Sequence, residues 1–235
     1  MAAQNDRKIV IVFAVFPWLT QLALTGAYEV LSRLPGAEVI IASITGGTLE
    51  SSKLAFSGLR RLADIPACDV ICVPGGLGVT EQMHDEAFLG ELRRLAKTAQ
   101  FVTSVCSGSL VLGAADLLKG KRATSHWAWR DALARFGAIP VSSQVVRDGN
   151  VVTGGGVTAG IDFALTLVSE IAGRDAAQAI QLQIAYAPSP PFGAGRPDTA
   201  PPHVLARVRE QSAAMAERRE AAIGVAVDRL RNHAA

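Results

Sequence analysis

Four short, uninterrupted apolar runs constrain the fold of this chain more than any other feature. They are rich in β-branched residues, are bounded by turn residues, and cover residues 8–13, 39–42, 69–73 and 101–105. A strand with one solvated face alternates apolar and polar residues, whereas a continuous apolar run is typical of a parallel strand covered on both faces. The runs therefore predict a mostly parallel central sheet between two layers of helices.

Segments with helical spacing separate and follow these runs. We expect helices over residues 26–34, 85–98, 107–118 and 126–136. Strands that alternate with helices are typical of a doubly wound α/β domain, which binds ligands at the carboxyl ends of its strands. A hairpin, residues 144–146 and 151–153 around Asp148-Gly149, and two helices, residues 157–172 and 175–186, complete the expected body.

The C-terminal part differs in composition from the body. Six of the eleven prolines lie between residues 188 and 202, which excludes regular structure there. Residues 200–232 return to helical spacing, and we expect one tail helix that packs on the body or on a second subunit. The chain is thus divided into an α/β domain, residues 1–199, and a C-terminal helix, residues 200–235.

Composition excludes several classes of partner. The 23 Lys and Arg residues nearly balance the 21 Asp and Glu residues, so the formal net charge of +2 does not favour nucleic-acid binding. No apolar run reaches the roughly 18 residues of a membrane span, and the first residues do not resemble a signal peptide. We expect no membrane partner and a cytoplasmic protein.

The cysteine count also favours a reducing compartment such as the cytoplasm. Cys68, Cys72 and Cys106 are an odd number and too few for a disulfide framework, so at least one thiol is free. Cys68 and Cys72 lack a second pair of ligands at zinc spacing, and we expect them to pack in the core and expect no metal site.

Cys106 lies where a predicted buried strand runs directly into a predicted helix. A nucleophile elbow requires small residues two before and two after the nucleophile, and Ser104 and Gly108 meet that requirement. A thiol at a helix N-terminus is expected to have a lowered pKa because free N–H groups and the helix dipole favour thiolate. Cys106 is therefore a candidate nucleophile, the alternative being a buried structural cysteine.

Other residues are candidate partners of this thiol. His126 is a candidate base, although it would otherwise cap a helix or hydrogen-bond locally. Gly75 and Gly76 follow the predicted strand at residues 69–73, and we expect a backbone N–H of this pair to act with that of Ser107 as an oxyanion donor. The glycines at 154–156 permit either close backbone approach to a ligand or tight packing.

Six segments carry a resemblance to a known family. They read PGG at 74–76, TSVCSGSLVLGAA at 103–115, KGKRATSHWAW at 119–129, VRDGN at 146–150, TGGGVTAGIDFALTL at 153–167 and YAPSPPF at 186–192. The chain resembles the ThiJ/PfpI superfamily, and within it the isocyanide hydratases. The resemblance implies a flavodoxin-like three-layer sandwich, a homodimer, and a cofactor-free lyase that converts an isocyanide and water into an N-formamide.

The resemblance also implies roles for individual residues. Cys106 is the implied nucleophile, with Ser107 as its hydroxyl neighbour. In these hydratases an aspartate in a motif similar to Gln-Leu-Asp-Leu-Thr-Gly handles the protons, but here Ala23 stands at its position. An engineered Asp→Ala substitution would account for this, as would a natural loss of activity or a different chemistry in the same fold.

The remaining site residues line the implied pocket. Val157 matches the aliphatic residue after the triple glycine, and we expect Gly156, His126 and Trp127 to lie near it. Two alternative functions stay open on the sequence. One is glyoxalase-like or amidase-like chemistry that uses Cys106 with His126. The other is a non-catalytic ligand or redox sensor that responds through Cys106 oxidation.

Overall fold

The computed structural model describes residues 8–234 and contains a central sheet of eight strands. The sheet has the order β3-β4-β2-β1-β5-β6-β10-β9, and its inner strands run parallel, whereas the β3–β4 and β9–β10 pairs at the two edges are antiparallel. The strands are β1 (Ile9–Ala14), β2 (Ala37–Ser43), β3 (Gly47–Ser51), β4 (Leu54–Arg61), β5 (Val70–Val73), β6 (Phe101–Val105), β9 (Val145–Asp148) and β10 (Val151–Gly154).

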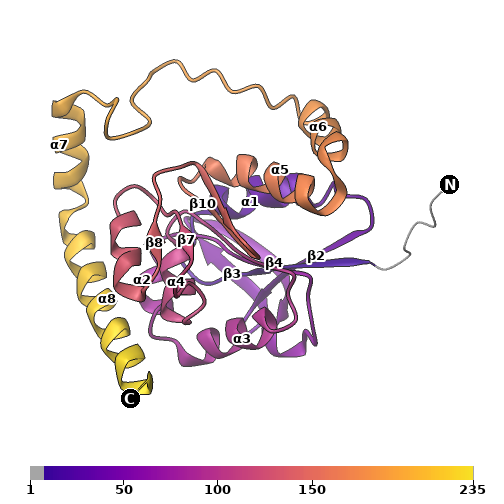
Figure 1. Ribbon diagram of the computed structural model, residues 1–235, viewed down its shortest axis with the longest axis horizontal. Coiled ribbons are helices and arrows are strands. Elements are labelled where there is room, and N and C mark those ends of the chain that lie inside the picture. The colour runs from indigo at the N-terminus through magenta and orange to yellow at the C-terminus, as the bar shows by residue number, and fades with distance from the viewer. Residues whose placement is uncertain (1–7, 235) are drawn as a thin grey trace.

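Helices cover both faces of this sheet, as the apolar runs predict (Figure 1). Helices α1, α5 and α6 pack together on one face, and α2, α3, α4 and the C-terminal α8 lie on the other. The helices are α1 (Gln21–Leu31), α2 (Val79–Gln82), α3 (Glu86–Ala96), α4 (Gly108–Ala114), α5 (Ala159–Ala172), α6 (Arg174–Gln183), α7 (Pro202–Gln211) and α8 (Ala213–Ala234). The prediction of a flavodoxin-like three-layer α/β sandwich with a mostly parallel sheet is confirmed.

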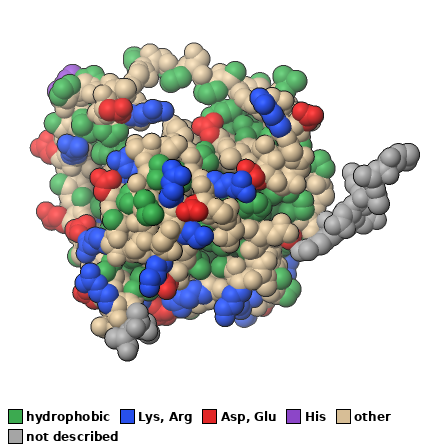
Figure 2. Space-filling model, viewed as in Figure 1, with side chains coloured by type: hydrophobic (Ala, Val, Ile, Leu, Met, Phe, Trp, Pro, Cys, Tyr) green, Lys and Arg blue, Asp and Glu red, His purple; other side chains and the backbone are tan. Residues whose placement is uncertain are grey.

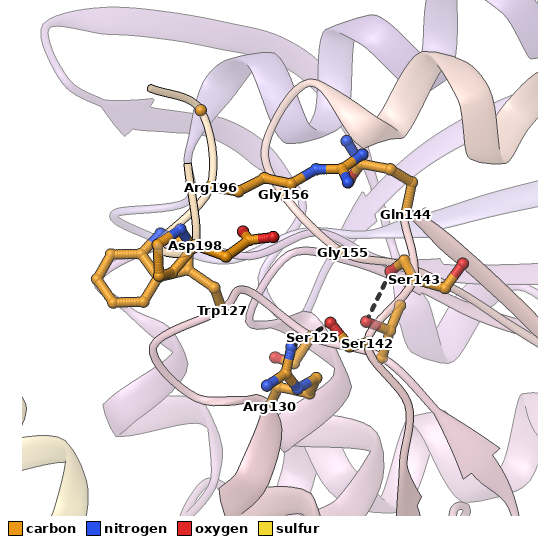
Figure 3. Close-up of a pocket in the computed structure, with 13 residues that line it drawn as sticks. Ser125, Trp127, Arg130, Ser142, Ser143, Gln144, Gly155, Gly156, Arg196 and Asp198 are labelled. Atoms are coloured by element: carbon orange, nitrogen blue, oxygen red, sulfur yellow. Dashed lines mark hydrogen bonds between the residues drawn. The ribbon is translucent and has the colours of Figure 1, made fainter. Parts of the chain in front are cut away.

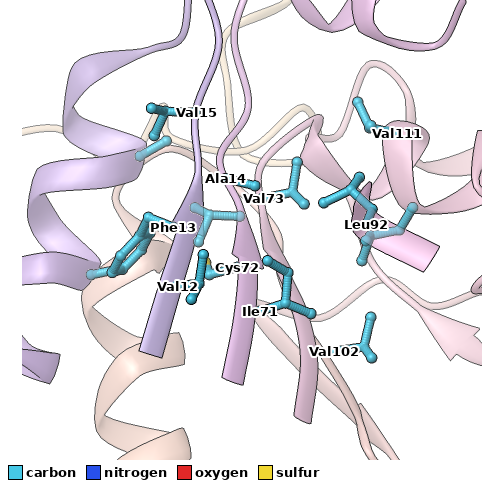
Figure 4. Close-up of a cluster of buried hydrophobic side chains, with 14 of the residues drawn as sticks. Val12, Phe13, Ala14, Val15, Ile71, Cys72, Val73, Leu92, Val102 and Val111 are labelled. Atoms are coloured by element: carbon cyan, nitrogen blue, oxygen red, sulfur yellow. The ribbon is translucent and has the colours of Figure 1, made fainter. Parts of the chain in front are cut away.

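The core lies between the inner strands and these two helical layers. Side chains of β1, β5 and β6 enter it from the sheet, and Leu92 of α3 and Val111 of α4 meet them from one helical layer (Figure 4). Burial of β-branched and aromatic side chains on both faces of β1 and β5 explains why their sequences are continuously apolar.

Helix α1 begins at Gln21, five residues before the predicted start at residue 26. Gly26 lies inside the helix, where it permits close contact with α5: an added Cβ would lie 3.3 Å from Cγ1 of Ile161. The glycine is therefore explained by helix–helix packing, and its reading as a helix boundary was wrong. Ala23 consequently lies in the first turn of α1.

The hairpin of β3 and β4 is absent from the sequence-based prediction. Its turn has Ser52 and Lys53 at φ 50° and 66°, a left-handed conformation that is usually signalled by Gly, Asn or Asp. Because neither residue gives that signal, the hairpin could not be recognised. The second hairpin, β9–β10, was predicted, but β9 extends through Asp148, and its turn consists of Gly149-Asn150, with Gly149 at φ 61°.

Two further predicted helices differ from the observed structure. Residues 126–136 do not form one α-helix: a turn precedes a 3-10 helix, η2 (Arg130–Phe136). The tail is divided into α7 and α8 at Ser212, whose hydroxyl donates to the carbonyl oxygen of Val208 at 2.7 Å and so competes with the regular helical pattern. A short two-stranded sheet, β7 (Arg122–Ala123) with β8 (Ile139–Pro140), flanks η2.

Residues 188–201 form an extended strap without helix or strand, as the prolines predict (Figure 1). The strap leads to α7 and then to α8, which packs on α2, α4 and η2. Ile223 and Ala226 of α8 are fully buried and belong to the same core cluster as the sheet.

Basic and acidic side chains are interspersed across the face shown in Figure 2. Within residues 8–234, no helix is both long and apolar enough to cross a membrane.

Candidate active site

Cys106 follows the last residue of β6 directly and precedes α4. Its backbone has φ 59°, a left-handed conformation that is uncommon for a non-glycine residue and marks strain at functional positions. Gly108 makes the turn possible, because a Cβ there would lie 2.1 Å from the carbonyl oxygen of Val73. The strand–turn–helix geometry of the predicted elbow is therefore present.

Hydrogen bonds fix the backbone of Cys106 in this conformation. Its N–H donates to the carbonyl oxygen of Gly154 at 2.9 Å. Its own carbonyl oxygen accepts from the hydroxyls of Ser109 and Ser125 at 3.3 and 3.2 Å. Ser104, two residues earlier, has a buried hydroxyl with no hydrogen-bond partner among the described residues, so its small size explains its place in the elbow better than bonding does.

The thiol of Cys106 is 5% exposed, and burial raises its pKa above the ordinary value. The N–H and hydroxyl of Ser107 bond to the thiol, and together with the positive charge of Arg219 they lower the pKa in opposition to burial. The prediction of a lowered pKa is wrong for the site as a whole, because desolvation is the larger effect. The predicted N-terminal donors are nevertheless in place.

The loop that contains Gly75 and Gly76 lies against the elbow. A Cβ on Gly75 would lie 2.7 Å from the Ser107 nitrogen and 2.8 Å from Cβ of Cys106. The N–H of Gly76 donates to the Ser107 hydroxyl at 3.2 Å. Gly76 therefore acts on the thiol through Ser107, and the side of Gly75 that would carry a Cβ faces Cys106 and Ser107.

The first turn of α1 is joined to the same loop. The N–H of Thr20 donates to the carbonyl oxygen of Gly75 at 2.8 Å, and Leu19 forms an antiparallel bridge with Gly76. Ala23 follows on this turn and is fully buried. The structure thus connects the turn that contains Ala23 to the loop beside the elbow.

The hydrogen bond of His126 is local. Its Nδ1 accepts from the N–H of Ala128 at 3.3 Å, and its ring lies 5.2 Å from that of Trp127. Burial, and secondarily Arg219, lower the pKa of His126 below its ordinary value. In the part of the chain that the structure describes, no hydrogen bond joins His126 to Cys106, which agrees with the local alternative.

A cleft of about 560 Å³ opens between the body and the strap (Figure 3). Gly156 and Trp127 line it, whereas Val157, His126 and Cys106 do not. Ser125 also lines this cleft and bonds to the Cys106 carbonyl oxygen, so the cleft adjoins the far side of the elbow. Val157 is half-buried and packs against the core.

Sequence reasoning missed Arg219, which α8 carries to the loop beside the elbow. This side chain is 3% exposed, and its guanidinium donates to the carbonyl oxygen of Gly76 at 2.8 Å. A signal existed: Arg219 precedes the buried Ile223 and Ala226 by four and seven residues, so it lies on the apolar face of the tail helix.

The other two cysteines lie away from these polar groups. Cys68 and Cys72 are buried, and burial raises the pKa of each to about 12. Among the residues described, no three His, Cys, Asp or Glu side chains are arranged to hold a metal ion.

The fold and this site define a class: flavodoxin-like α/β proteins with a cysteine at a strand-to-helix elbow. The chain belongs to the DJ-1/PfpI family, whose model matches residues 7–170.

Individual relatives agree with this assignment. The chain is 54% identical to the isonitrile hydratase of Pseudomonas putida over 202 residues, which cover 86% of this chain and 89% of the relative. A ThiJ/PfpI family protein from Pseudomonas syringae superposes with a TM-score of 0.89 at 40% identity, covering 92% of this chain and 91% of that one. Drosophila melanogaster DJ-1beta superposes with a TM-score of 0.67 at 25% identity, covering 77% of this chain and all of that one.

Proposed function

We propose that this chain carries the site of an isocyanide hydratase, in which Cys106 adds to the terminal carbon of an isocyanide. The observation that carries the proposal is the 54% identity to an isonitrile hydratase over nearly the full length of both chains. It is supported by the elbow at Cys106, where Ser107 offers two hydrogen bonds to the sulfur. Isocyanide and water are the proposed substrates, and an N-formamide is the product.

The reaction balances without a cofactor. The thiolate forms a bond to the terminal carbon, which then takes a proton and gives a thioimidate, R–N=CH–S–Cys106. Water adds to that carbon and the nitrogen takes a proton. The C–S bond then breaks, so that R–NH–CHO leaves and the thiol is regenerated. Ser107, whose N–H and hydroxyl bond to the sulfur, stabilises the thiolate at the first and last steps.

These steps need a group that moves protons, and Ala23 cannot supply one. The loss of a general acid or base costs about 10²- to 10⁴-fold in rate. We therefore propose that the chain as it stands is an impaired hydratase whose scaffold is otherwise complete. Ala23 is buried on the turn that bonds to Gly75, and the resemblance to the hydratases implies that a carboxylate placed there would face Cys106.

The test is the substitution Ala23→Asp, followed by measurement of formamide production from cyclohexyl isocyanide by mass spectrometry. We expect turnover to rise about 10²- to 10⁴-fold over the present chain. Ala23→Asn is the matched control, because it adds a side chain of similar size that does not exchange a proton at neutral pH. Absence of formamide from Ala23→Asp, in a folded protein whose Cys106 is alkylated normally, would contradict the substrate assignment.

We also propose that two copies of the chain form a homodimer. Leu182 and Phe192, before and within the strap, are 82% and 79% exposed, and no side chain of α7 is buried, although Val204 and Val208 are apolar. The resemblance implies a homodimer, and these exposed apolar side chains are available for its interface. Light scattering at micromolar concentration should give twice the chain mass; a monomer would contradict the proposal.

A further inference from the structure

Arg219 is a buried cation that lies against the elbow loop from outside the α/β body. Its guanidinium donates to the carbonyl oxygens of Gly76 and Leu77 at 2.8 and 3.2 Å, and its Nε donates to the Thr80 hydroxyl at 3.2 Å. The guanidinium carbon also lies 4.9 Å from the centre of the Trp129 ring. Every contact therefore joins α8 to the loop and helix that follow β5, or to the turn before η2.

The electrostatic environment of this arginine points toward the thiol. No carboxylate lies within ion-pair distance of Arg219 in the described part of the chain, and a buried charge without a partner is costly. Two negative charges stabilise the guanidinium of Arg219: a thiolate at Cys106 has the larger effect, and Glu81 of α2 has the smaller. Glu81 also forms an ion pair with the exposed Arg218. His126 is the other titratable group that Arg219 affects.

Hydrogen bonds provide a second connection between Arg219 and the thiol. Arg219 binds the carbonyl oxygen of Gly76, the N–H of Gly76 donates to the Ser107 hydroxyl, and that hydroxyl bonds to Cys106. Since a planar guanidinium bonds in a fixed geometry, it restrains the direction of the peptide groups around Gly76. The restraint is passed to Ser107 and so to the sulfur.

We propose that Arg219 is a positioning residue for Cys106, which makes the C-terminal helix part of the active site. Its charge stabilises the thiolate across the Gly76 loop, and its hydrogen bonds hold the N–H of Gly76 toward Ser107. Its effect on turnover rests on the proposed hydratase function, but its effect on the thiol does not. The two are therefore tested separately.

The experiment measures the pKa of Cys106 from the pH dependence of its alkylation by iodoacetamide, with the labelled peptide identified by mass spectrometry. Arg219→Met removes the charge and the hydrogen bonds, and we expect the pKa to rise by about one unit or more, so that alkylation at a fixed pH below the pKa slows about tenfold. Arg219→Gln keeps an N–H donor and removes the charge, and we expect a smaller rise. It also serves if the methionine variant does not fold.

Arg229→Met is the matched control. Arg229 lies on the same helix and donates to the carbonyl oxygens of Met83 and Ala114, so it also joins α8 to the body, but it pairs with Glu86 and lies away from the elbow. We expect this variant to lose stability without a change in the pKa of Cys106. An unchanged pKa in both Arg219 variants, or an equal shift in Arg229→Met, would overturn the proposal.

Turnover is measured separately, with each arginine variant combined with Ala23→Asp. A raised thiol pKa together with a kcat reduced about tenfold would support both the positioning role and the hydratase function. If Ala23→Asp gives no formamide while Arg219→Met still raises the pKa of Cys106, the proposed function fails and the positioning role of Arg219 stands.

Discussion

Cys72 and Cys106 are two buried thiols with different surroundings. Cys72 lies inside β5, opposite Thr103 of β6 in the parallel register, and is fully buried in the sheet. Cys106 lies one residue beyond the end of β6, in the left-handed turn. Burial raises the pKa of both thiols. At Cys72 the Thr103 hydroxyl alone opposes this effect, whereas at Cys106 a backbone N–H, a hydroxyl and a guanidinium oppose it.

The difference shows that burial alone does not define a reactive cysteine. A thiol inside a strand is surrounded by backbone groups that are already paired in the sheet, so few donors remain for a thiolate. Past the end of the strand, the first N–H groups of α4 are free to donate, and the loop of Gly76 and the Arg219 side chain of α8 supply further polar groups. A thiol just past the end of the strand is therefore buried and still has neighbouring groups that favour its thiolate.

The largest effect expected from this difference is on turnover. In the Ala23→Asp background, Cys106→Ala should reduce formamide production to the uncatalysed rate, because the carbon–sulfur intermediate cannot form. Cys72→Ala should retain turnover, since its sulfur lies within the sheet. Both rates are measured by mass spectrometry, and equal loss in the two variants would mean that Cys106 is needed only for structure.

The second effect is on stability in alkali. The pKa of Cys72 is about 12 in the folded protein against 9.0 for a free thiol, so the folded state holds the proton more tightly. The resulting stabilisation is complete below pH 9 and is lost as the pH rises from 9 to 12, by up to about 4 kcal/mol, or a factor of about a thousand.

The measurement compares urea unfolding of the present chain and of Cys72→Ala between pH 8 and pH 11. The variant should be less stable at pH 8 because of the cavity, but its stability should fall less steeply with pH. Cys106→Ala is the contrast, because it removes a thiol whose pKa a backbone N–H, a hydroxyl and a guanidinium lower in opposition to burial. If stability fell equally steeply with pH in Cys72→Ala and Cys106→Ala, the proposed difference between the two thiols would be contradicted.

The elbow was predictable because its determinants are local. Ser104, Cys106 and Gly108 lie within five residues, and the apolar run before them identifies the strand. The β9–β10 hairpin and the strap were also predictable from local sequence, the hairpin from the glycine at 149 and the strap from its prolines. The β3–β4 hairpin was missed because Ser52 and Lys53 adopt a glycine-like conformation without a glycine.

The surroundings of the thiol could not be predicted in the same way, because they depend on which distant segments meet. Arg219 is more than a hundred residues from Cys106, and its role requires α8 to pack on α2 and α4. The direction of the Cys106 pKa shift also needs the depth of burial, which a sequence does not give. His126 was a reasonable partner by residue type, but the short turn before η2 directs its Nδ1 to Ala128.

A third effect is selectivity in alkylation. In the native protein at pH 8, we expect a small electrophile such as iodoacetamide to label Cys106 about a hundredfold faster than Cys72 or Cys68, because a backbone N–H, a hydroxyl and a guanidinium together favour the thiolate at the elbow. Peptide mass spectrometry after a time course gives the three rates. Labelling of Cys72 at the rate of Cys106 would show that the sheet opens as readily as the elbow, whereas denaturation in urea should make all three rates similar.

The smallest effect isolates one of the groups that distinguish the two thiols. Ser107→Ala removes the hydroxyl between Gly76 and Cys106 and leaves the backbone N–H in place. A hydrogen bond to a charged group contributes about 1.5 kcal/mol, so the pKa of Cys106 should rise by about one unit and alkylation at a fixed pH below the pKa should slow about tenfold. Ser109→Ala is the matched control, since its hydroxyl bonds to the Cys106 carbonyl oxygen rather than to the sulfur. An unchanged pKa in Ser107→Ala would mean that the backbone N–H is the donor to the sulfur. The hydroxyl would then serve only to hold the turn through its bond to Gly76.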